Sequence, residues 1–405
     1  MIEILFLILA FFLGILAGTF TGLFPGIHIN LVAFLLLGSA ALLTGFSPII
    51  LVTFIVAMSI THTFLDFIPS IFLGAPDEDS VLSILPGHEF LIKGKGYEAI
   101  ILTAFGSLAA IAIVLLLTPL FIFTLPTIYP YIQNIMPFVL LIASFFLIYF
   151  EKKSKSWAII IFLLAGFLGI ASLNLNLKEP LLPMLTGLFG ASSLITSIMK
   201  KQTLPEQKIE TIRNIKKELK NTSLFRALGA SLIASPLCSF IPALGSGQAA
   251  VIGSEVTGDL DRKEFLILLG SINTIVMGLS FVTLYAIGKG RTGSAVAVGK
   301  LISNLTFTNL ITILVVIVLA GIIAFFLTIF LAKFASKNIT RIKYNKLSIG
   351  ILILLSVLVL IFSGFLGFLV FVVSASLGLV CIFTGVRRIH LMACLLVPTI
   401  LLYLL

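Results

Sequence analysis

The sequence has few charged residues and few cysteines. Charged residues make up 10% of its 405 residues, whereas a soluble globular domain carries roughly 25%. A soluble chain of this length would need far more polar surface to cover its core, so a cytosolic enzyme and a disordered protein are both excluded. Its three cysteines stand alone in apolar stretches. Without a CxxC or Cys/His cluster, neither a disulfide framework nor a metal site is expected.

The sequence consists mainly of long apolar segments. Hydrophobic residues make up 60% of the chain, and the mean hydropathy is +1.24. At about 20 residues per crossing, this is enough for roughly 10 to 12 transmembrane helices. We therefore predict an all-α polytopic membrane protein in the cell membrane, surrounded by membrane lipid.

The chain has 26 basic and 16 acidic residues, and this excess of positive charge is also typical of a membrane protein. Basic residues collect in cytoplasmic loops of membrane proteins, so no nucleic-acid partner is expected. Four basic groups, near 151–155, 200–226, 333–346 and 387–388, are placed in the cytoplasm. This assignment puts both chain termini on the outer side.

Interruptions of the apolar segments recur at matching places in the two halves. Pro242 follows Pro25 by 217 residues, and Gly288 follows Gly74 by 214. The near-equal offsets predict a duplication, with repeats at 1–199 and 224–405 and a basic linker at 200–223. The charge pattern predicts that the repeats are inverted in the membrane, with broken or re-entrant helices, as in many secondary transporters. The alternative is that such breaks recur by chance.

The first pair of interruptions predicts an anion site. A proline suits the first turn of a helix, and the free N–H groups and positive dipole end there attract anions. Glycines allow a ligand to approach the backbone, and the polar side chains can donate hydrogen bonds. The substrate-binding candidates are Gly22, Pro25, Gly26, His28, Asn30, Pro242, Gly245, Ser246, Gly247 and Gln248. The alternative is a kinked helix whose glycines serve helix contacts only.

A second candidate site is the pair His62 and Asp66. On a helix these residues are four apart and share a face. Ionisable residues inside a membrane are costly and usually functional. The pair could relay a proton, or Asp66 could hold Na⁺, and no other cofactor is expected. A hydrogen-bonded pair near the interface, without function, is the alternative; a metal site would need a third ligand, and none is evident.

The second pair of interruptions carries charges of opposite sign. Asp77, Glu78 and Asp79 follow Gly74, while Lys289 and Arg291 follow Gly288. The basic pair could neutralise an anionic substrate, or it could form a gate with the acids. Solvated loops are the alternative.

Three further features have simpler interpretations. We expect interhelical hydrogen bonds at Asn273, Asn304 and Asn309. Glu255 is expected in a solvated connection. The stretch 204–221 is expected to form a charged surface helix.

Several short motifs resemble a known family. Phe72-Leu-Gly-Ala-Pro76, together with the segment from Leu85-Pro-Gly87 to Lys93-Gly-Lys-Gly96, looks like the large membrane subunit of tripartite tricarboxylate transporters, and more closely like its archaeal relatives of undefined function. The resemblance covers residues 1–330. It implies a secondary transporter for carboxylates driven by a proton or Na⁺ gradient. It also implies a small membrane subunit and an extracytoplasmic binding protein as partners. The acids at 77–79 depart from the family pattern.

Together these features predict a secondary active transporter of a small organic anion, not an enzyme. A flippase for a polyprenyl-phosphate or another anionic lipid is the nearest alternative. An intramembrane enzyme would use His62 and Asp66 as acid and base. A structural protein would use the breaks only for packing. The sequence leaves a homo-oligomer open.

Overall fold

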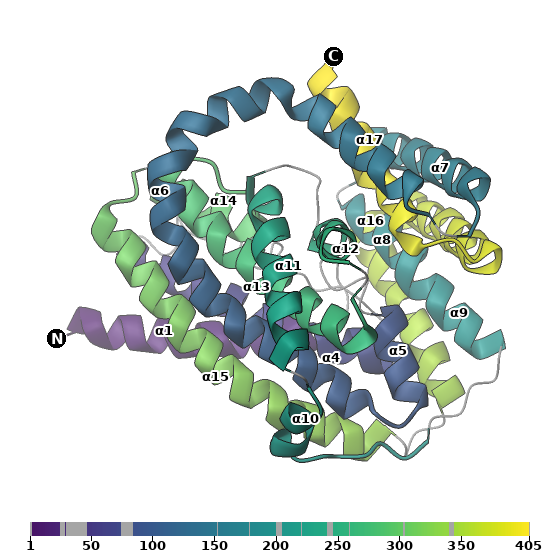
Figure 1. Cartoon of the computed structure of the whole chain (residues 1–405), viewed down its shortest axis with the longest axis horizontal. Helices are drawn as coiled ribbons and strands as arrows, with labels where there is room; N and C mark the ends of the chain where they lie inside the picture. Colours follow the sequence, from purple (N-terminus) through teal and green to yellow (C-terminus); the bar gives the residue numbers. More distant parts are fainter. Residues whose placement is uncertain are drawn as a thin grey trace.

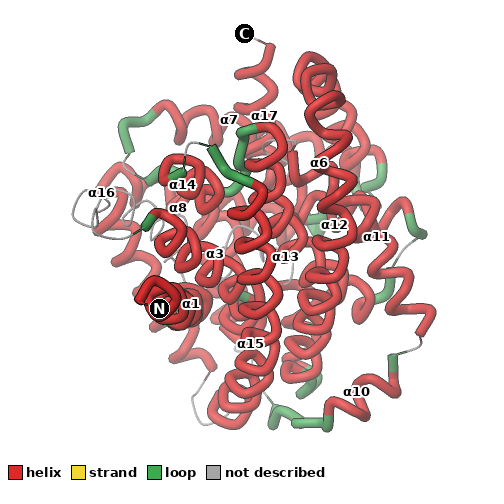
Figure 2. The backbone as a smooth tube through the Cα atoms, turned by 90° about the vertical axis from the view of Figure 1, so that its left-hand side faces the viewer, coloured by secondary structure: helices red, strands yellow, loops and turns green. Residues whose placement is uncertain are grey.

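The chain is described by a computed structural model in twelve stretches. They cover residues 2–24, 29, 47–73, 84–151, 153–177, 179–199, 205–219, 221–240, 246–258, 260–302, 304–339 and 344–404. Within these stretches every regular element is a helix and no strand occurs, as Figure 2 shows. The prediction of an all-α polytopic membrane protein is confirmed.

The helices follow one another along the chain as shown in Figure 1. Their bounds are α1 Ile2–Leu23, α3 Pro48–Leu65, α4 Phe67–Leu73, α5 Ile84–Ile92, α6 Gly96–Tyr149, α7 Lys155–Asn174, α8 Leu181–Leu185, the π-helical turn η3 Thr186–Ala191, α9 Ser192–Met199, α10 Ile212–Glu218, α11 Asn221–Phe240, α12 Ser246–Val256, α13 Arg262–Ile287, α14 Gly293–Leu301, α15 Phe307–Ile339, α16 Tyr344–Thr384, the 3₁₀ turn η4 Arg388–Met392 and α17 Ala393–Leu404.

Eight helical stretches in the described part of the chain are long and apolar enough to cross a membrane. One is α6, whose 54 residues span roughly 80 Å, more than twice the apolar thickness of a bilayer. It rises along one side of the molecule, curves over the top and reaches α7 on the other side (Figure 1). In α16 the chain changes direction at Gly364, which has a φ of 67°. Counting α6 and α16 as two crossings each gives about ten crossings within the described residues.

Burial separates a central helix from peripheral ones. In its most apolar stretch, α13 has 94% of its residues buried, compared with 28% in α1 and 22% in α16. The exposed residues of α1 and α16 are mostly Leu, Ile, Val and Phe. Apolar side chains of this kind are stable against lipid, so α13 forms the centre of the protein and the other two helices lie at its edge.

Glycines let α1 lie directly on α3. Gly14, Gly18 and Gly22 recur every four residues, so they share one face of α1. A Cβ atom at Gly22 would lie 2.8 Å from the Cβ of Leu65, and one at Gly18 would overlap the carbonyl oxygen of Met58. The two backbones therefore approach as in other small-residue helix contacts.

Helices α11 and α12 form an antiparallel hairpin. Arg226, near the start of α11, donates a hydrogen bond to the carbonyl of Gly258, just after the end of α12. Further in, Gly253 of α12 lies against Ala230 of α11. The chain thus returns to the side from which it entered, as in a re-entrant segment. Residues 241–245, which join the two arms, lie outside the described residues.

The helix contacts follow a pattern that relates the two halves. α13 packs along α6, and α3 packs along α15. Similarly α5 touches α13, and α14 touches α3. Exchanging α3 with α13, α6 with α15 and α5 with α14 turns each of these contacts into another that is observed. The duplication stays a prediction, which this pattern favours.

An ionic layer lies at the end of the molecule where α6, α11 and α13 begin. The buried carboxylate of Glu98 contacts Lys95 at 3.1 Å and Lys263 at 2.6 Å. Lys263 also binds Glu218 of α10 at 2.9 Å, and this contact lowers the pKa of Glu218. The ionic layer therefore joins α10 to helices of both halves.

The linker between the halves differs from the surface helix expected over 204–221. Residues 205–211 are extended and follow the turn between α5 and α6. There Lys208 donates its N–H to the carbonyl of Gly94 at 2.7 Å, and Gln207 accepts from the N–H of Gly96 at 2.9 Å. Within the described part of the linker, 205–219, only α10 is helical. Pairing with this turn satisfies backbone groups that a helix would have satisfied internally, which is why the prediction failed.

One expectation about a charged residue was also wrong. Glu255 does not lie in a solvated connection, because its side chain is 10% exposed and binds Arg387 at 2.6 Å. The neighbouring Arg388, in the fourth basic group, contacts η3. Its guanidinium donates to the carbonyls of Leu188 and Phe189 in η3. These partners are distant in the sequence, so local charge patterns did not indicate them.

Candidate functional site

A buried polar cluster lies where α3 contacts α13. Asp66 stands at the end of α3, directly before α4, and its Oδ2 accepts a hydrogen bond from Nδ2 of Asn273 at 2.9 Å. One turn earlier, the hydroxyls of Thr63 and Thr274 are 3.1 Å apart. All four side chains are at most 3% exposed. The cluster joins one helix from each half through side chains, and the expected interhelical hydrogen bond at Asn273 is present.

His62 extends this cluster toward α1. Its Nδ1 lies 3.0 Å from the hydroxyl oxygen of Thr21, and both side chains are buried. Thr21 reaches His62 because the next residue, Gly22, lets α1 lie against α3. The structure therefore places His62 and Asp66 in one buried region, as their four-residue spacing predicted. It assigns Gly22 to this helix contact.

The cluster lies deep within the apolar part of the protein. Asn273 follows the start of α13 at Arg262 by 11 residues and precedes its end at Ile287 by 14. At 1.5 Å per residue, it is roughly 16 Å from the start of the helix, close to half the thickness of a bilayer core. Asp66 shares this depth because it binds Asn273. A carboxylate at such a depth is energetically costly, so its presence there indicates a function.

The second candidate region lies at the ends of the hairpin arms next to residues 241–245. Ser246 and Gly247 begin α12 and are both buried. Ser246 is 10 residues from Val256 at the other end of α12, which places it roughly 15 Å from the base of the hairpin. The N-terminus of α12 therefore points its backbone N–H groups toward the interior, the geometry in which helices bind anions.

Arg291 reaches this region from the loop after α13. Its guanidinium donates to the carbonyl of Cys238, in the last turn of α11. The loop is held by Ser280 of α13, whose hydroxyl oxygen accepts from the backbone N–H of Arg291 and of Thr292, each at 2.9 Å. Ser280 follows Asn273 by seven residues, so both lie on one face of α13 about 10 Å apart. This face of α13 connects the polar cluster to the hairpin.

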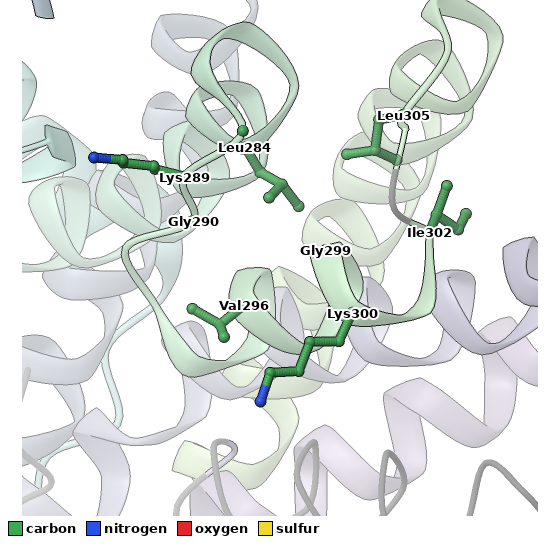
Figure 3. Close-up of a pocket in the computed structure, with 9 residues that line it drawn as sticks. Leu284, Lys289, Gly290, Val296, Gly299, Lys300, Ile302 and Leu305 are labelled. Atoms are coloured by element: carbon green, nitrogen blue, oxygen red, sulfur yellow. The ribbon is translucent and has the colours of Figure 1, made fainter. Parts of the chain in front are cut away.

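Lys289 points elsewhere, although it is only two residues from Arg291. Its ammonium group lies 5.0 Å from the ring centre of Tyr129 and 3.4 Å from Oε1 of Gln133, both in the middle of α6. A cavity of about 400 Å³ lies beside this loop (Figure 3). Leu284 and Leu305 extend toward each other across it, whereas Lys289 extends away on the other side of the loop. The basic pair is thus divided, and only Arg291 lies at the hairpin.

Other predicted residues lie outside the described residues. They are Pro25, Gly26, His28, Asn30, Asp77, Glu78, Asp79, Pro242 and Gly245. For Gln248, the backbone belongs to α12 and the side chain is not described. In the parts of the chain that are described, no three His, Cys, Asp or Glu side chains gather as a metal site would require.

The chain is similar to known proteins over its whole length. The model of the tripartite tricarboxylate transporter TctA family matches residues 8–393, which extends beyond the resemblance expected for 1–330. The chain is also 30% identical over 419 residues to the uncharacterized protein MJ1079 of Methanocaldococcus jannaschii, and this alignment covers 100% of both proteins. No solved structure matches the chain.

Proposed function

This chain belongs to the tripartite tricarboxylate transporter TctA family, a family of transport components in the membrane, and from that premise we propose that it is a secondary active transporter of a small organic anion. The anion is of the carboxylate class, and a proton or Na⁺ gradient drives its movement. Asp66 and His62 are the residues that respond to the coupling cation.

The hydrogen bond between Asp66 and Asn273 is the observation that carries this proposal. It joins α3 of the first half to α13 of the second half at the centre of the protein. A cation bound by the Asp66 carboxylate neutralises its charge, and the hydrogen bond to Asn273 weakens as a result. Cation binding therefore changes the contact between the halves, which is the requirement for coupling a gradient to a conformational change.

The anion binds at the ends of the hairpin arms. The backbone N–H groups at the start of α12, with Ser246 and Gly247, supply donors and a positive dipole end. Arg291 adds a full positive charge next to the last turn of α11. We propose that Pro25, Gly26, His28 and Asn30, in the equivalent segment of the first half, also bind the anion. Rocking of the halves then exposes the site to each side of the membrane in turn.

The family also implies other components. A tripartite transporter works with a small membrane subunit and an extracytoplasmic substrate-binding protein, and we propose both as partners of this chain. The end of the molecule that carries the ionic layer and the linker is assigned to the cytoplasm. The binding protein then docks at the opposite end.

Uptake by proteoliposomes tests the proposal. The purified chain is reconstituted, and uptake of labelled di- and tricarboxylates is measured with an inward proton gradient, an inward Na⁺ gradient or neither. We expect gradient-dependent uptake of at least one carboxylate, with the small membrane subunit and binding protein added where the chain alone is slow. Uptake that is independent of both gradients would refute the proposal. So would the absence of uptake of every carboxylate tested with all components present. Movement of a labelled anionic lipid between leaflets would instead favour a flippase.

A further inference from the structure

The base of the α11–α12 hairpin carries an ion pair that the proposed transport cycle does not use. Glu255 is the second-last residue of α12, and its Oε1 lies 2.6 Å from Nη1 of Arg387. The Glu255 side chain is 10% exposed and that of Arg387 is 28% exposed, so water reaches the pair only in part. Arg387 belongs to the turn before η4. The pair therefore connects α12 to a distant part of the chain.

Arg387 is held firmly on its own side of this contact. Its backbone N–H donates to Oε2 of Glu151 at 3.0 Å, and Nε2 of His390 lies 2.9 Å from the same oxygen. The other oxygen of Glu151 accepts from the N–H of Lys153 at 2.9 Å. Burial alone would raise the pKa of Glu151, but these hydrogen bonds lower it, so the carboxylate stays ionised near neutral pH. Glu151 thereby ties the α6–α7 connection to the turn that carries Arg387.

Glu255 stands on a part of the protein that is suited to move. α12 has 11 residues and begins next to residues 241–245, so it is a short arm with an interruption at its far end. Gly253 lets α12 lie closely against Ala230 of α11. Both residues are small, so no long side chains interdigitate between the two helices at this contact. The base of the other arm is held separately, by Arg226 to Glu264 at 3.3 Å. The Glu255–Arg387 pair is thus the ionic anchor of α12.

We propose that the Glu255–Arg387 ion pair is a latch that fastens the base of α12 to the turn before η4, and that it must open for α12 to move away from α11 when the hairpin releases the anion. This proposal rests on the transport function proposed above, because it assumes that the hairpin moves. Arg387 acts through α12 and is a positioning residue. Opening of the latch separates the two arms at their far ends, where Cys238 is buried beside the start of α12.

Maleimide labelling of Cys238 tests the latch without any transport assay. The full chain is labelled in detergent, and peptide mapping separates Cys238 from Cys381 and Cys394, which are also buried. We expect E255Q and R387Q to raise the labelling rate at Cys238 about fivefold, which corresponds to about 1 kcal/mol, while the other two cysteines keep their rates. The charge-swapped double variant E255R/R387E should return the rate to that of the wild type.

A matched control separates the latch from ion pairs in general. Arg262 and Glu89 form a pair at 3.1 Å that joins α13 to α5 and includes no residue of α11 or α12. The variant E89Q should leave labelling at Cys238 unchanged. An unchanged rate in E255Q and R387Q, or an equal rise at all three cysteines, would overturn the latch. R387K keeps the charge if R387Q does not yield folded protein, and it should label more slowly than E255Q. Latch-dependent labelling without carboxylate uptake, measured with the small membrane subunit and the binding protein present, would refute the transport function and leave the ion pair only as an anchor of α12.

Discussion

Replacing Asp66 by Asn removes the charge of the coupling residue and keeps its shape. In the wild type, Oδ2 of Asp66 accepts a hydrogen bond from Asn273 at 2.9 Å. A hydrogen bond to a charged group contributes about 1.5–3 kcal/mol, and one between neutral groups contributes about 0.5–1.5 kcal/mol. D66N should therefore lower the free energy of unfolding by about 1 kcal/mol, and the protein should still fold. What it loses is the carboxylate that binds the coupling cation.

The expected consequence is the loss of concentrative uptake. A tenfold gradient of one coupling cation supplies about 1.4 kcal/mol, which supports about tenfold accumulation when the membrane potential is clamped. In reconstituted vesicles the wild type should approach this ratio, whereas D66N should stay at about one. S59A is the matched control, because Ser59 is buried on the same helix and its hydroxyl bonds to the carbonyl of Ile55 at 2.7 Å. Tenfold accumulation by D66N would refute the coupling role.

Three further changes test separate parts of the account. G18A should lower the free energy of unfolding by about 1–3 kcal/mol, because its Cβ would overlap the carbonyl oxygen of Met58. G350A lies in helix α16 with open space around its Cβ, so it should not lower this free energy and should raise it by up to about 1 kcal/mol. Thermal unfolding in detergent measures both. R291Q should raise KM for the anion about tenfold, because one charge next to the last turn of α11 is lost. K289Q should leave KM unchanged because that side chain contacts α6, so equal effects in uptake assays would contradict the division of the basic pair. The lowered pKa of Glu151 means that its ionised form stabilises the folded state; this contribution is complete above the ordinary value of 4.5 and is lost as the pH falls through the lower folded-state pKa. The unfolding temperature should therefore fall less in E151Q than in the wild type between about pH 5 and pH 3. An equal fall of the unfolding temperature in both proteins would contradict a stabilising role of the ionised Glu151.

Local patterns in the sequence predicted the class of the protein and one buried pair. The apolar segments indicated a helical membrane protein because each crossing must satisfy its own backbone. The four-residue spacing of His62 and Asp66 placed them on one face, and both are buried in the structure. The partner of Asp66 could not be chosen in this way. Asn273 is 207 residues away, and Asn304 and Asn309 lay in segments that looked equally suitable.

The prolines of α6 show where the rules of local structure were too strict. Prolines often end a helix, yet α6 is continuous through Pro119, Pro126, Pro130 and Pro137. A proline removes one hydrogen bond and bends a helix without having to end it. The contact between Glu255 and Arg387 was missed for another reason. It depends on how three distant turns meet, and nothing in the neighbouring residues encodes that.

Simultaneous recording of anion and cation movement tests the central claim most directly. Vesicles containing the chain receive a labelled carboxylate outside with no cation gradient imposed, and the entry of protons or Na⁺ is recorded together with that of the anion. The account predicts that the cation enters with the anion in the wild type and that this cation flux disappears in D66N. Carboxylate entry without any cation movement in the wild type would contradict it.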